Sequence, residues 1–291
     1  MTYDDAGSGA RTARRHDRQE GCLDRPRDPL PTRVDSTPEL PAQYADALDA
    51  GLDALALTLA PGARATIDGH VRLLLAWNAA INLTAIRDPA EIAVRHVLDS
   101  LTGLQALDGG RDRRIVDLGS GGGFPGLPLA AALPESRVRL IESVAKKARF
   151  LQAAVAATGL SDRIEVLALR AEALAIDRAG GRWDSVTARA VASLAELVEL
   201  ALPLLRPGGR LIAWKSATAV ADQGPEVAAA RRAIAAIDPS ARIDIQSALR
   251  GPVPPAVLAL ADHRFAIVTR SDRSIVGRWP RDPAARRRAP W

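Results

Sequence analysis

A glycine-rich segment, IVDLGSGGGFPGLPLA (115–130), narrows most sharply what this chain can fold into. An apolar triplet typical of a β-strand runs into Asp117, several glycines follow closely, and Pro125 opens a helical stretch. Glycines adopt backbone conformations and permit close approaches that other residues resist. A strand, a glycine loop and a helix in this order predict an α/β domain that holds a nucleotide-like ligand near the helix N-terminus.

Two classes of ligand fit this loop. Gly121 opens the dinucleotide pattern G-x-G-x-x-G, and Glu142 follows at a distance suited to a ribose-binding acid, so an NAD(P)-dependent oxidoreductase is one interpretation. An acid two residues before the first glycine, here Asp117, is typical of methyltransferases that use S-adenosylmethionine (SAM). SAM carries an ammonium and a sulfonium but no phosphate. A carboxylate suits those cations, and Pro125 removes an amide that a pyrophosphate would use, so the residues favour SAM.

Other candidate cofactor contacts follow the next two predicted strands. Glu142 ends the second strand, where its carboxylate could accept both ribose hydroxyls of an adenosine. Ala171 and Glu172 come just after the third strand and are placed to meet the adenine edge. An acid that only begins a helix would give the same pattern at either position.

Strands and helices alternate after residue 110. Five strands are predicted, at 114–118, 137–141, 163–167, 183–188 and 210–214. Helices are predicted at 125–132, 145–158 and 194–205, with RPGG (206–209) as a turn before the fifth strand. This alternation predicts a mainly parallel sheet with helices on both faces. A further helix at 225–237 precedes two weaker strands, 243–246 and 263–269, which we expect to close the sheet as an antiparallel pair.

The rest of the chain divides by composition and charge. Residues 1–38 have almost no apolar periodicity and are expected to be a disordered extension. Residues 39–110 space their apolar side chains at three and four, which predicts an N-terminal cap of about three helices; the α/β domain spans 111–270. Residues 271–291 form a basic tail. From residue 270 onward seven arginines face two aspartates, so the net charge of +5 lies there. A nucleic-acid partner would favour this distribution, although a solvated tail has the same composition.

Composition also bears on localisation. The single cysteine, Cys22, excludes an intramolecular disulfide. No uncharged apolar run reaches the roughly 18 residues of a membrane span, and the N-terminus lacks the apolar core of a secretory signal. We expect a cytoplasmic protein without membrane segments or a metal.

The chain lacks the signatures of two base-methylating chemistries. Methylation of an exocyclic amine uses a [D/N/S]-P-P-[Y/F/W] strand end, but the fourth strand ends in VTARAVASL; cytosine C5 methylation needs a thiolate, and Cys22 lies in the extension. Guanine N7 attacks a methyl group without first losing a proton, so its site needs positioning and charge rather than a base. Arg189 at the end of the fourth strand could hold guanine O6 or a phosphate, and Lys215 at the end of the fifth could contact an RNA phosphate. A structural salt bridge and a surface lysine are the alternatives.

These residues resemble the RsmG (GidB) family of bacterial guanine-N7 methyltransferases of 16S ribosomal RNA. Besides the glycine loop, the matching segments are WNAAINLTAIRDPAEIAVRHVLDSL (77–101), LIESVAKKARFLQ (140–152), ARAVASLAELVELALPLLRPGGRLIAWK (188–215) and HRFAIVTR (263–270). The first is the most specific, because many methyltransferases share the glycine loop.

The resemblance implies a Rossmann-like class I fold with a seven-stranded sheet closed by an antiparallel strand, plus SAM as donor. The expected product is 7-methylguanine at position 527 of 16S RNA, made on small-subunit RNA or an assembling 30S subunit by a monomer. An RNA-binding module with a non-catalytic SAM fold is the non-enzymatic alternative. The implied SAM contacts are Gly119, Phe124, Ala171, Glu172 and Arg189. A cap motif near the cofactor crevice is matched by Asn82, Arg95, His96 and Asp99, and no catalytic step is assigned to His96.

Overall fold

The computed structural model describes residues 30–107, 114–176, 181–222 and 224–291, and Pro31–Trp291 forms one unit. The predicted extension 1–38, with Cys22, lies outside the described residues as far as residue 29. Its remaining part contains a short 3-10 turn at Val34–Ser36. Among the described residues, no helix combines the length and apolar character needed to cross a membrane.

Three helical stretches precede the first strand, as the apolar spacing predicted. They are α1 (Ala42–Ala54), α2 (Pro61–Ile81) and a continuous helical run made of α3 (Pro89–Ile92), a π-helical turn (Ala93–Leu98) and α4 (Asp99–Thr102). The run begins where Asp88 accepts a hydrogen bond from the Glu91 amide at 2.8 Å, with proline in the first position. Such π-helical turns are frequent at functional sites, and this one contains Arg95 and His96.

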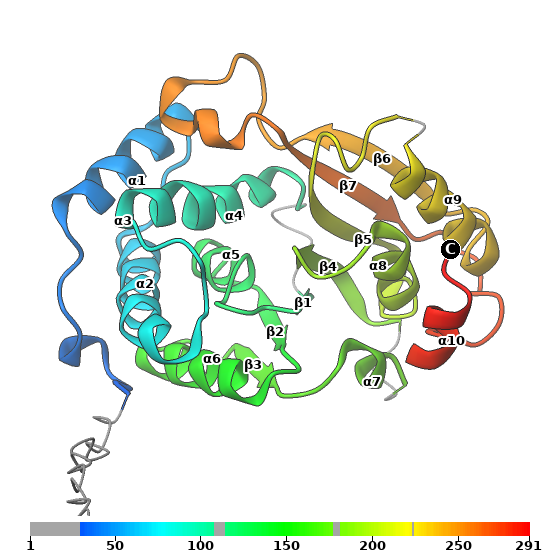
Figure 1. Ribbon diagram of the computed structural model, residues 1–291, viewed down its shortest axis with the longest axis horizontal. Coiled ribbons are helices and arrows are strands. Elements are labelled where there is room, and N and C mark those ends of the chain that lie inside the picture. The colour runs from blue at the N-terminus through cyan, green and yellow to red at the C-terminus, as the bar shows by residue number, and fades with distance from the viewer. Residues whose placement is uncertain (1–29, 108–113, 177–180, 223) are drawn as a thin grey trace, which may run out of the picture. The chain divides into compact units, whose positions relative to one another are not determined.

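Seven strands form one sheet in the order β3-β2-β1-β4-β5-β7-β6 (Figure 1). The strands are β1 (Arg114–Leu118), β2 (Arg137–Ile141), β3 (Ile164–Leu167), β4 (Trp183–Arg189), β5 (Leu205–Ser216), β6 (Arg242–Ser247) and β7 (His263–Thr269). Neighbours from β3 to β5 are parallel, and β7 is antiparallel to both β5 and β6. The predicted parallel sheet and its antiparallel closing pair are confirmed.

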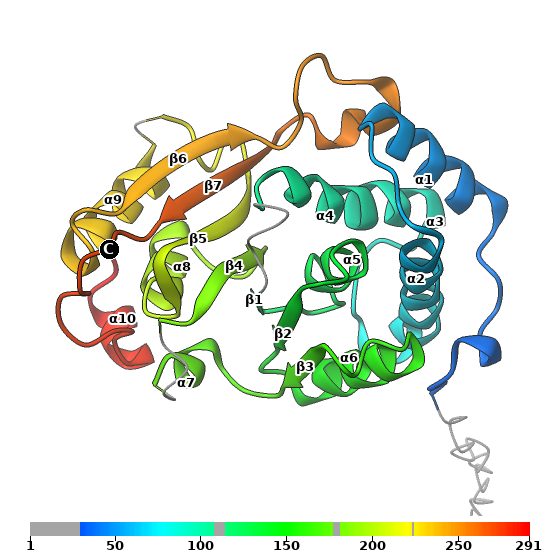
Figure 2. The same ribbon diagram turned by 180° about the vertical axis from the view of Figure 1, so that it is seen from behind.

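The strand order fixes which helices cover which face. Starting from β1 in the interior of the sheet, β2 and β3 are added toward one edge, whereas β4 and β5 are added toward the other. Because parallel crossovers are right-handed, helices of the two halves lie on opposite faces. One face carries α5 (Gly126–Ala132) and α6 (Ala145–Ala157), against which α2 packs in turn; the other carries α8 (Leu194–Ala201) and α9 (Pro225–Ile237) (Figures 1 and 2). The strand order therefore reverses between the parallel neighbours β1 and β4.

Several predicted boundaries were wrong. The helix predicted to reach residue 205 ends at Ala201, and β5 already begins at Leu205. The segment RPGG is part of β5, where the pairing with β4 shifts register, rather than a turn before it. Two short helices were missed: α7 (Ala171–Ile176) and α10 (Pro283–Arg288). Two 3-10 turns complete the fold, at Gly103–Gln105 and Pro255–Leu260.

Candidate active site

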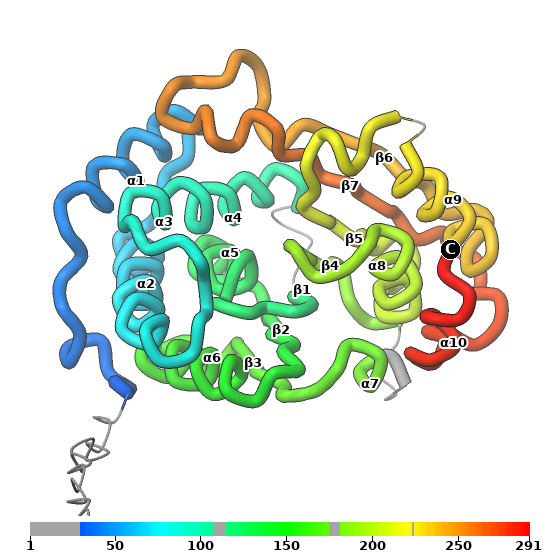
Figure 3. The backbone as a smooth tube through the Cα atoms, viewed as in Figure 1, coloured from blue at the N-terminus to red at the C-terminus, as the bar shows by residue number. Residues whose placement is uncertain are grey.

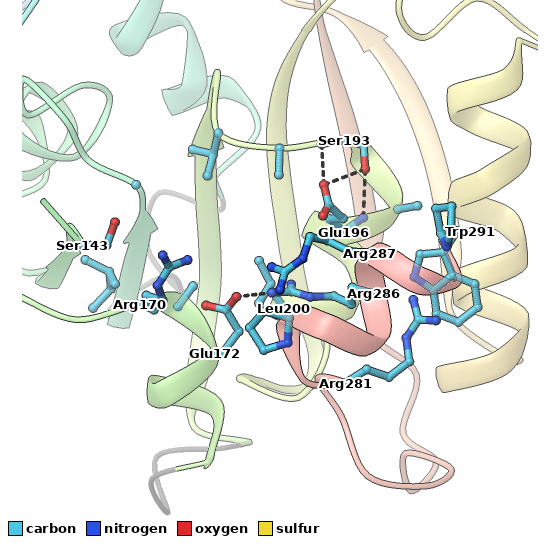
Figure 4. A pocket seen from close by; sticks show the side chains of 18 of the residues that line it. Ser143, Arg170, Glu172, Ser193, Glu196, Leu200, Arg281, Arg286, Arg287 and Trp291 are labelled. Carbon is cyan, nitrogen blue, oxygen red and sulfur yellow. Dashed lines mark hydrogen bonds and ion pairs between the residues drawn. The ribbon is translucent and has the colours of Figure 1, made fainter.

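A cavity of about 740 Å³ opens at the carboxyl ends of the first four strands. In a doubly wound sheet, ligands bind outside these ends at the point where the strand order reverses. The cavity also has walls from α8, α9 and the C-terminal residues (Figure 4). From the strand ends, the lining residues are Gly119, Ile141, Ser143, Leu169, Arg170, Ala171, Glu172, Val191, Ala192 and Ser193. The structure thus brings three predicted cofactor contacts together: Gly119, Ala171 and Glu172.

The glycine loop requires glycine at two positions for different reasons. Gly119 has a φ of +67°, and a Cβ there would lie 2.7 Å from Cγ2 of Val191, another cavity residue. Gly126 lies where α5 meets the sheet, and its Cβ would lie 2.4 Å from Cδ2 of Leu140. One glycine keeps the cavity wall open, and the other lets helix and strand approach closely.

Glu142 supports the glycine loop from the end of β2. Its Oε2 accepts a hydrogen bond from the Gly121 amide at 3.0 Å, and its Oε1 accepts one from the Val144 amide at 2.7 Å. The side chain is buried, and its sequence neighbours Ile141 and Ser143 line the cavity, whereas Glu142 itself does not. Since an ionised carboxylate offers about four acceptor positions, these two amides leave capacity for a ligand hydroxyl.

Asp117 lies behind the loop and does not line the cavity. Successive side chains of a strand point to opposite faces, and Asp117 points toward α5, where its Oδ2 would lie 2.8 Å from a Cβ on Gly126. Its Oδ1 accepts a hydrogen bond from Oγ1 of Thr187 at 2.7 Å, whereas Oδ2 has no partner among the described residues. Burial raises the pKa of Asp117 to about 6. A cofactor contact at Asp117 therefore remains only a prediction.

His70 contacts the glycine loop, which the sequence pattern did not predict. This α2 residue is fully buried, and its Nε2 lies 2.7 Å from the carbonyl oxygen of Gly122. A carbonyl only accepts, so Nε2 donates, and Nδ1 remains without a partner among the described residues. Burial lowers the pKa of His70 to about 4. The sequence contains no signal that marks this histidine as a loop contact, because it lies among the apolar residues of a helix face.

Arg189 is the centre of a polar network between β4 and the N-terminal helices. Its Nη1 donates to Oδ2 of Asp99 at 2.8 Å and to the carbonyl oxygen of Arg95 at 3.0 Å. Its Nη2 lies 3.1 Å from Nδ1 of His96, and its Cζ lies 5.4 Å from the ring centre of Phe124. Phe124 in turn stacks on His96, with ring centres 4.8 Å apart. Two residues of the cap motif thus hold Arg189 by side chain and one by backbone, while Asn82 ends α2 at the surface.

The partners of His96 determine its tautomer. An arginine can only donate, so Nδ1 accepts from Arg189, and the proton lies on Nε2, 2.7 Å from Oγ1 of Thr84. Burial, followed by the positive charge of Arg189, lowers the pKa of His96 to about 4. At neutral pH its ring is therefore uncharged, and its lone pair is already engaged.

Asp99 connects this network to residues of β5 and β7. The buried carboxylate also accepts a hydrogen bond from Nδ1 of His263 at 2.6 Å through Oδ1, and its backbone carbonyl accepts one from Nε1 of Trp214 at 3.0 Å. His263 begins β7, and its contact with the site was not predicted from the sequence. Its position in the segment HRFAIVTR was the available signal.

Lys215 lies away from the surface in a local ion pair. Its Nζ donates to Oε1 of Glu226 at 2.5 Å and to the carbonyl oxygen of Ala192 at 2.8 Å. The same Glu226 oxygen accepts the Leu194 amide at 2.8 Å. Since Ala192 lines the cavity, Lys215 fixes the loop after β4. These contacts favour a positioning role over a phosphate contact.

The buried histidine His70 predicts an acid-dependent loss of stability. Its folded pKa of about 4 lies below the usual 6.5, so the unfolded chain takes up a proton first, and stability falls as pH drops from 6.5 toward 4. We expect His70→Gln, which keeps a donor for Gly122, to reduce the loss of unfolding free energy between pH 7 and 4.5 by about 2–3 kcal/mol. Urea titrations at both pH values measure this. Asp117 has the opposite sign but contributes equally to both proteins, so equal losses in both would contradict the assignment.

Comparison with known proteins identifies the family of this chain. The family model described as rRNA small subunit methyltransferase G (GidB) matches residues 64–236. A protein named Ribosomal RNA small subunit methyltransferase G from Sorangium cellulosum is 43% identical over 188 residues, covering 64% of this chain and 76% of that protein. One of the same name from Roseiflexus castenholzii is 51% identical over 163 residues, covering 56% and 67%.

A solved structure is similar in fold. The crystal structure of cofactor-bound Rv0187 from MTB is 22% identical, with a TM-score of 0.50 over 77% of this chain and 96% of that chain. The family match begins within α2 and continues through the glycine loop and the strands β1 to β5 into the last turn of α9. The resemblance seen in the sequence is therefore confirmed: this chain belongs to the GidB family of rRNA small subunit methyltransferases G.

Proposed function

We propose that this chain uses SAM to methylate N7 of a guanine in 16S ribosomal RNA. Two observations carry the proposal. One is the cavity at the strand ends, and the other is the Arg189 network at the end of β4, whose histidine is neutral and already hydrogen-bonded. Guanine N7 has a free lone pair, so its methylation needs orientation and charge but no base. The NAD(P)-dependent oxidoreductase is not favoured, because the family match is to methyltransferases.

The cavity fits the proposed cofactor in size and chemistry. Its volume lies within the roughly 300–1,000 Å³ of small-molecule sites, and Leu169 and Val191 give it apolar walls. When bound, SAM supplies a methyl group carried on a sulfonium sulfur. Gly119 would allow close backbone approach, Glu142 would accept the ribose hydroxyls, and Ala171 with Glu172 would meet the adenine.

We place the guanine that accepts the methyl group beside the Arg189 network. Arg189 and Phe124 connect the glycine loop to the N-terminal helices, and the buried Asp99 carboxylate orients the guanidinium. Arg189 thus serves by position and charge, and His96 orients it without exchanging a proton. Lys215 acts indirectly, through the loop after β4.

We propose that the protein acts in the cytoplasm as a monomer and that the methylated guanine is at position 527 of the RNA. Mapping 7-methylguanine in 16S RNA from cells with and without this protein tests the base and its position. Methyl transfer to purified 16S RNA and to 30S subunits then distinguishes naked RNA from the particle. Persistence of the modification in cells lacking the protein would refute the proposal. Binding of S-adenosylhomocysteine (SAH) without transfer would favour the non-catalytic RNA-binding module.

The basic C-terminal region predicts salt-dependent RNA binding. Arg273 and Arg278 are exposed there. The slope of log K against log salt is negative, and removing one arginine that pairs with a phosphate reduces its magnitude by about 0.7 on single strands. We expect the double alanine variant to reduce this magnitude by about one to two, measured by filter binding from 50 to 300 mM salt. A control that replaces two other exposed arginines, Arg242 and Arg250, should leave it unchanged; equal slopes in all three proteins would move the RNA surface elsewhere.

A further inference from the structure

The last thirteen residues, 279–291, form the outer wall of the cavity and are here named the C-terminal segment. Their chain folds back beside α7 and α8 in the ribbon and the tube (Figures 1 and 3). The segment contains α10, which begins where Asp282 accepts the amides of Ala284 and Ala285 at 2.8 and 2.9 Å. Its cavity-lining residues are Arg281, Pro283, Arg286, Arg287, Pro290 and Trp291. The predicted basic tail is thus partly built into the cavity.

A buried acid anchors the C-terminal segment. Glu199 of α8 is fully buried, and its carboxylate accepts hydrogen bonds from Nη2 of Arg281 at 2.7 Å and from Nε1 of Trp291 at 2.7 Å. The Arg281 guanidinium also lies 4.3 Å from the Trp291 ring centre. A buried charge without partners is strongly destabilising, so Glu199 favours the seated position of the segment.

The C-terminal segment also contacts a predicted adenine-binding residue directly. Arg286 forms an ion pair with Glu172, which lies in the first turn of α7 on the opposite wall (Figure 4). The two side chains are only 9% and 16% exposed, so the pair is largely shielded from water and salt. The neighbouring Arg288 is exposed and does not line the cavity. Arg286 therefore differs from Arg288 in its contacts while sharing its charge and helix.

We infer that the C-terminal segment is part of the cofactor site and that Arg286 is a positioning residue that fixes Glu172 against the bound cofactor. This inference rests on the proposed function, because it takes SAM as the ligand. A carboxylate fixed before binding loses less freedom when the ligand arrives, which raises affinity. Removing the arginine frees Glu172 to rotate and hydrate. The effect belongs to cofactor affinity, not to the methyl-transfer step.

Calorimetry with SAH on the full chain tests this inference. We expect Arg286→Ala to weaken SAH binding about tenfold and Arg286→Lys, which keeps the charge, to recover most of it. The matched control Arg288→Ala should bind like the unaltered chain. In methylation assays, the KM for SAM should rise about tenfold in R286A while kcat at saturating SAM stays the same.

A double-mutant cycle separates positioning from a general effect on the fold. Glu172→Gln removes the ion pair from the other side, so adding Arg286→Ala to it should cause little further loss. The inference would be overturned if Arg286→Ala lost as much SAH affinity in the Glu172→Gln protein as in the unaltered chain, or if R286A and R288A bound SAH equally well. Either result would leave the proposed function standing. Failure of the unaltered chain to bind SAH would overturn the proposed function and the inference together. If R286A does not fold, Arg286→Gln, which removes the charge but keeps most of the side-chain length, takes its place both in the comparison with Arg288→Ala and in the cycle with Glu172→Gln.

Discussion

A Gly119→Val variant is expected to bind SAM at least about a hundredfold more weakly than the unaltered chain while remaining folded. A side chain at this residue would lie 2.7 Å from Val191 Cγ2, and both residues line the cavity. The clash can only be relieved by movement in that wall, which disturbs the surface on which the cofactor would lie. A hundredfold loss corresponds to about 2.7 kcal/mol. The positive φ adds about 1–2 kcal/mol of strain, which a typical domain tolerates.

Gly159 provides the matched control. Its φ of +71° is close to the +67° of Gly119, but a Cβ there meets nothing within 4 Å. Gly159→Val therefore carries a similar backbone strain without a clash at the cavity, and it should bind SAH normally. Calorimetry with thermal unfolding of both variants makes the comparison. Near-normal affinity in a folded Gly119→Val protein would show that the loop does not hold the cofactor.

The second large effect is expected at Arg189. We expect Arg189→Lys to lower the single-turnover methyl-transfer rate about ten- to a hundredfold, although the positive charge is kept. The planar guanidinium reaches Asp99, the Arg95 carbonyl and His96 at once, and an ammonium on a flexible stem does not reproduce that fork. A charge-assisted hydrogen bond is worth about 1.5–3 kcal/mol, which gives this range if it is felt in the transition state.

The comparison with His96 tests the mechanism. We expect His96→Gln to slow transfer much less than Arg189→Lys, because His96 orients the arginine without exchanging a proton. With a folded pKa of about 4, His96 stays neutral from pH 6 to 9, so it should impose no pH dependence on the rate in that range. A single ionisation that shapes the rate of the unaltered chain and vanishes in His96→Gln would establish a general base and contradict the N7 mechanism proposed here.

Local patterns were sufficient for most elements of the fold. The strand 263–269 and the helix 225–237 were predicted to the residue, because apolar periodicity, Pro225 and the flanking polar residues are all local signals. The segment RPGG misled for a physical reason: two glycines predict a turn, but pairing with β4 extends the strand through them with a register shift. Asp282-Pro283 is the same helix-start signal as Asp88-Pro89, so α10 could have been found from the sequence.

The features of the candidate site also fall into two groups, those that local sequence signals predict and those that depend on contacts between distant segments. The succession of strands and helices along the chain, the glycine loop and the residues at the strand ends could be predicted from the sequence, because each depends on neighbours in the chain. Three features of the site emerged only from the folded chain: Asp117 points toward α5, Lys215 is paired with Glu226, and His70 supports the loop. The folded chain also places the basic C-terminal residues in the wall of the cavity. Each of these contacts joins residues distant in the sequence, and a side chain's partner and burial, which set its charge state, exist only once those segments pack together.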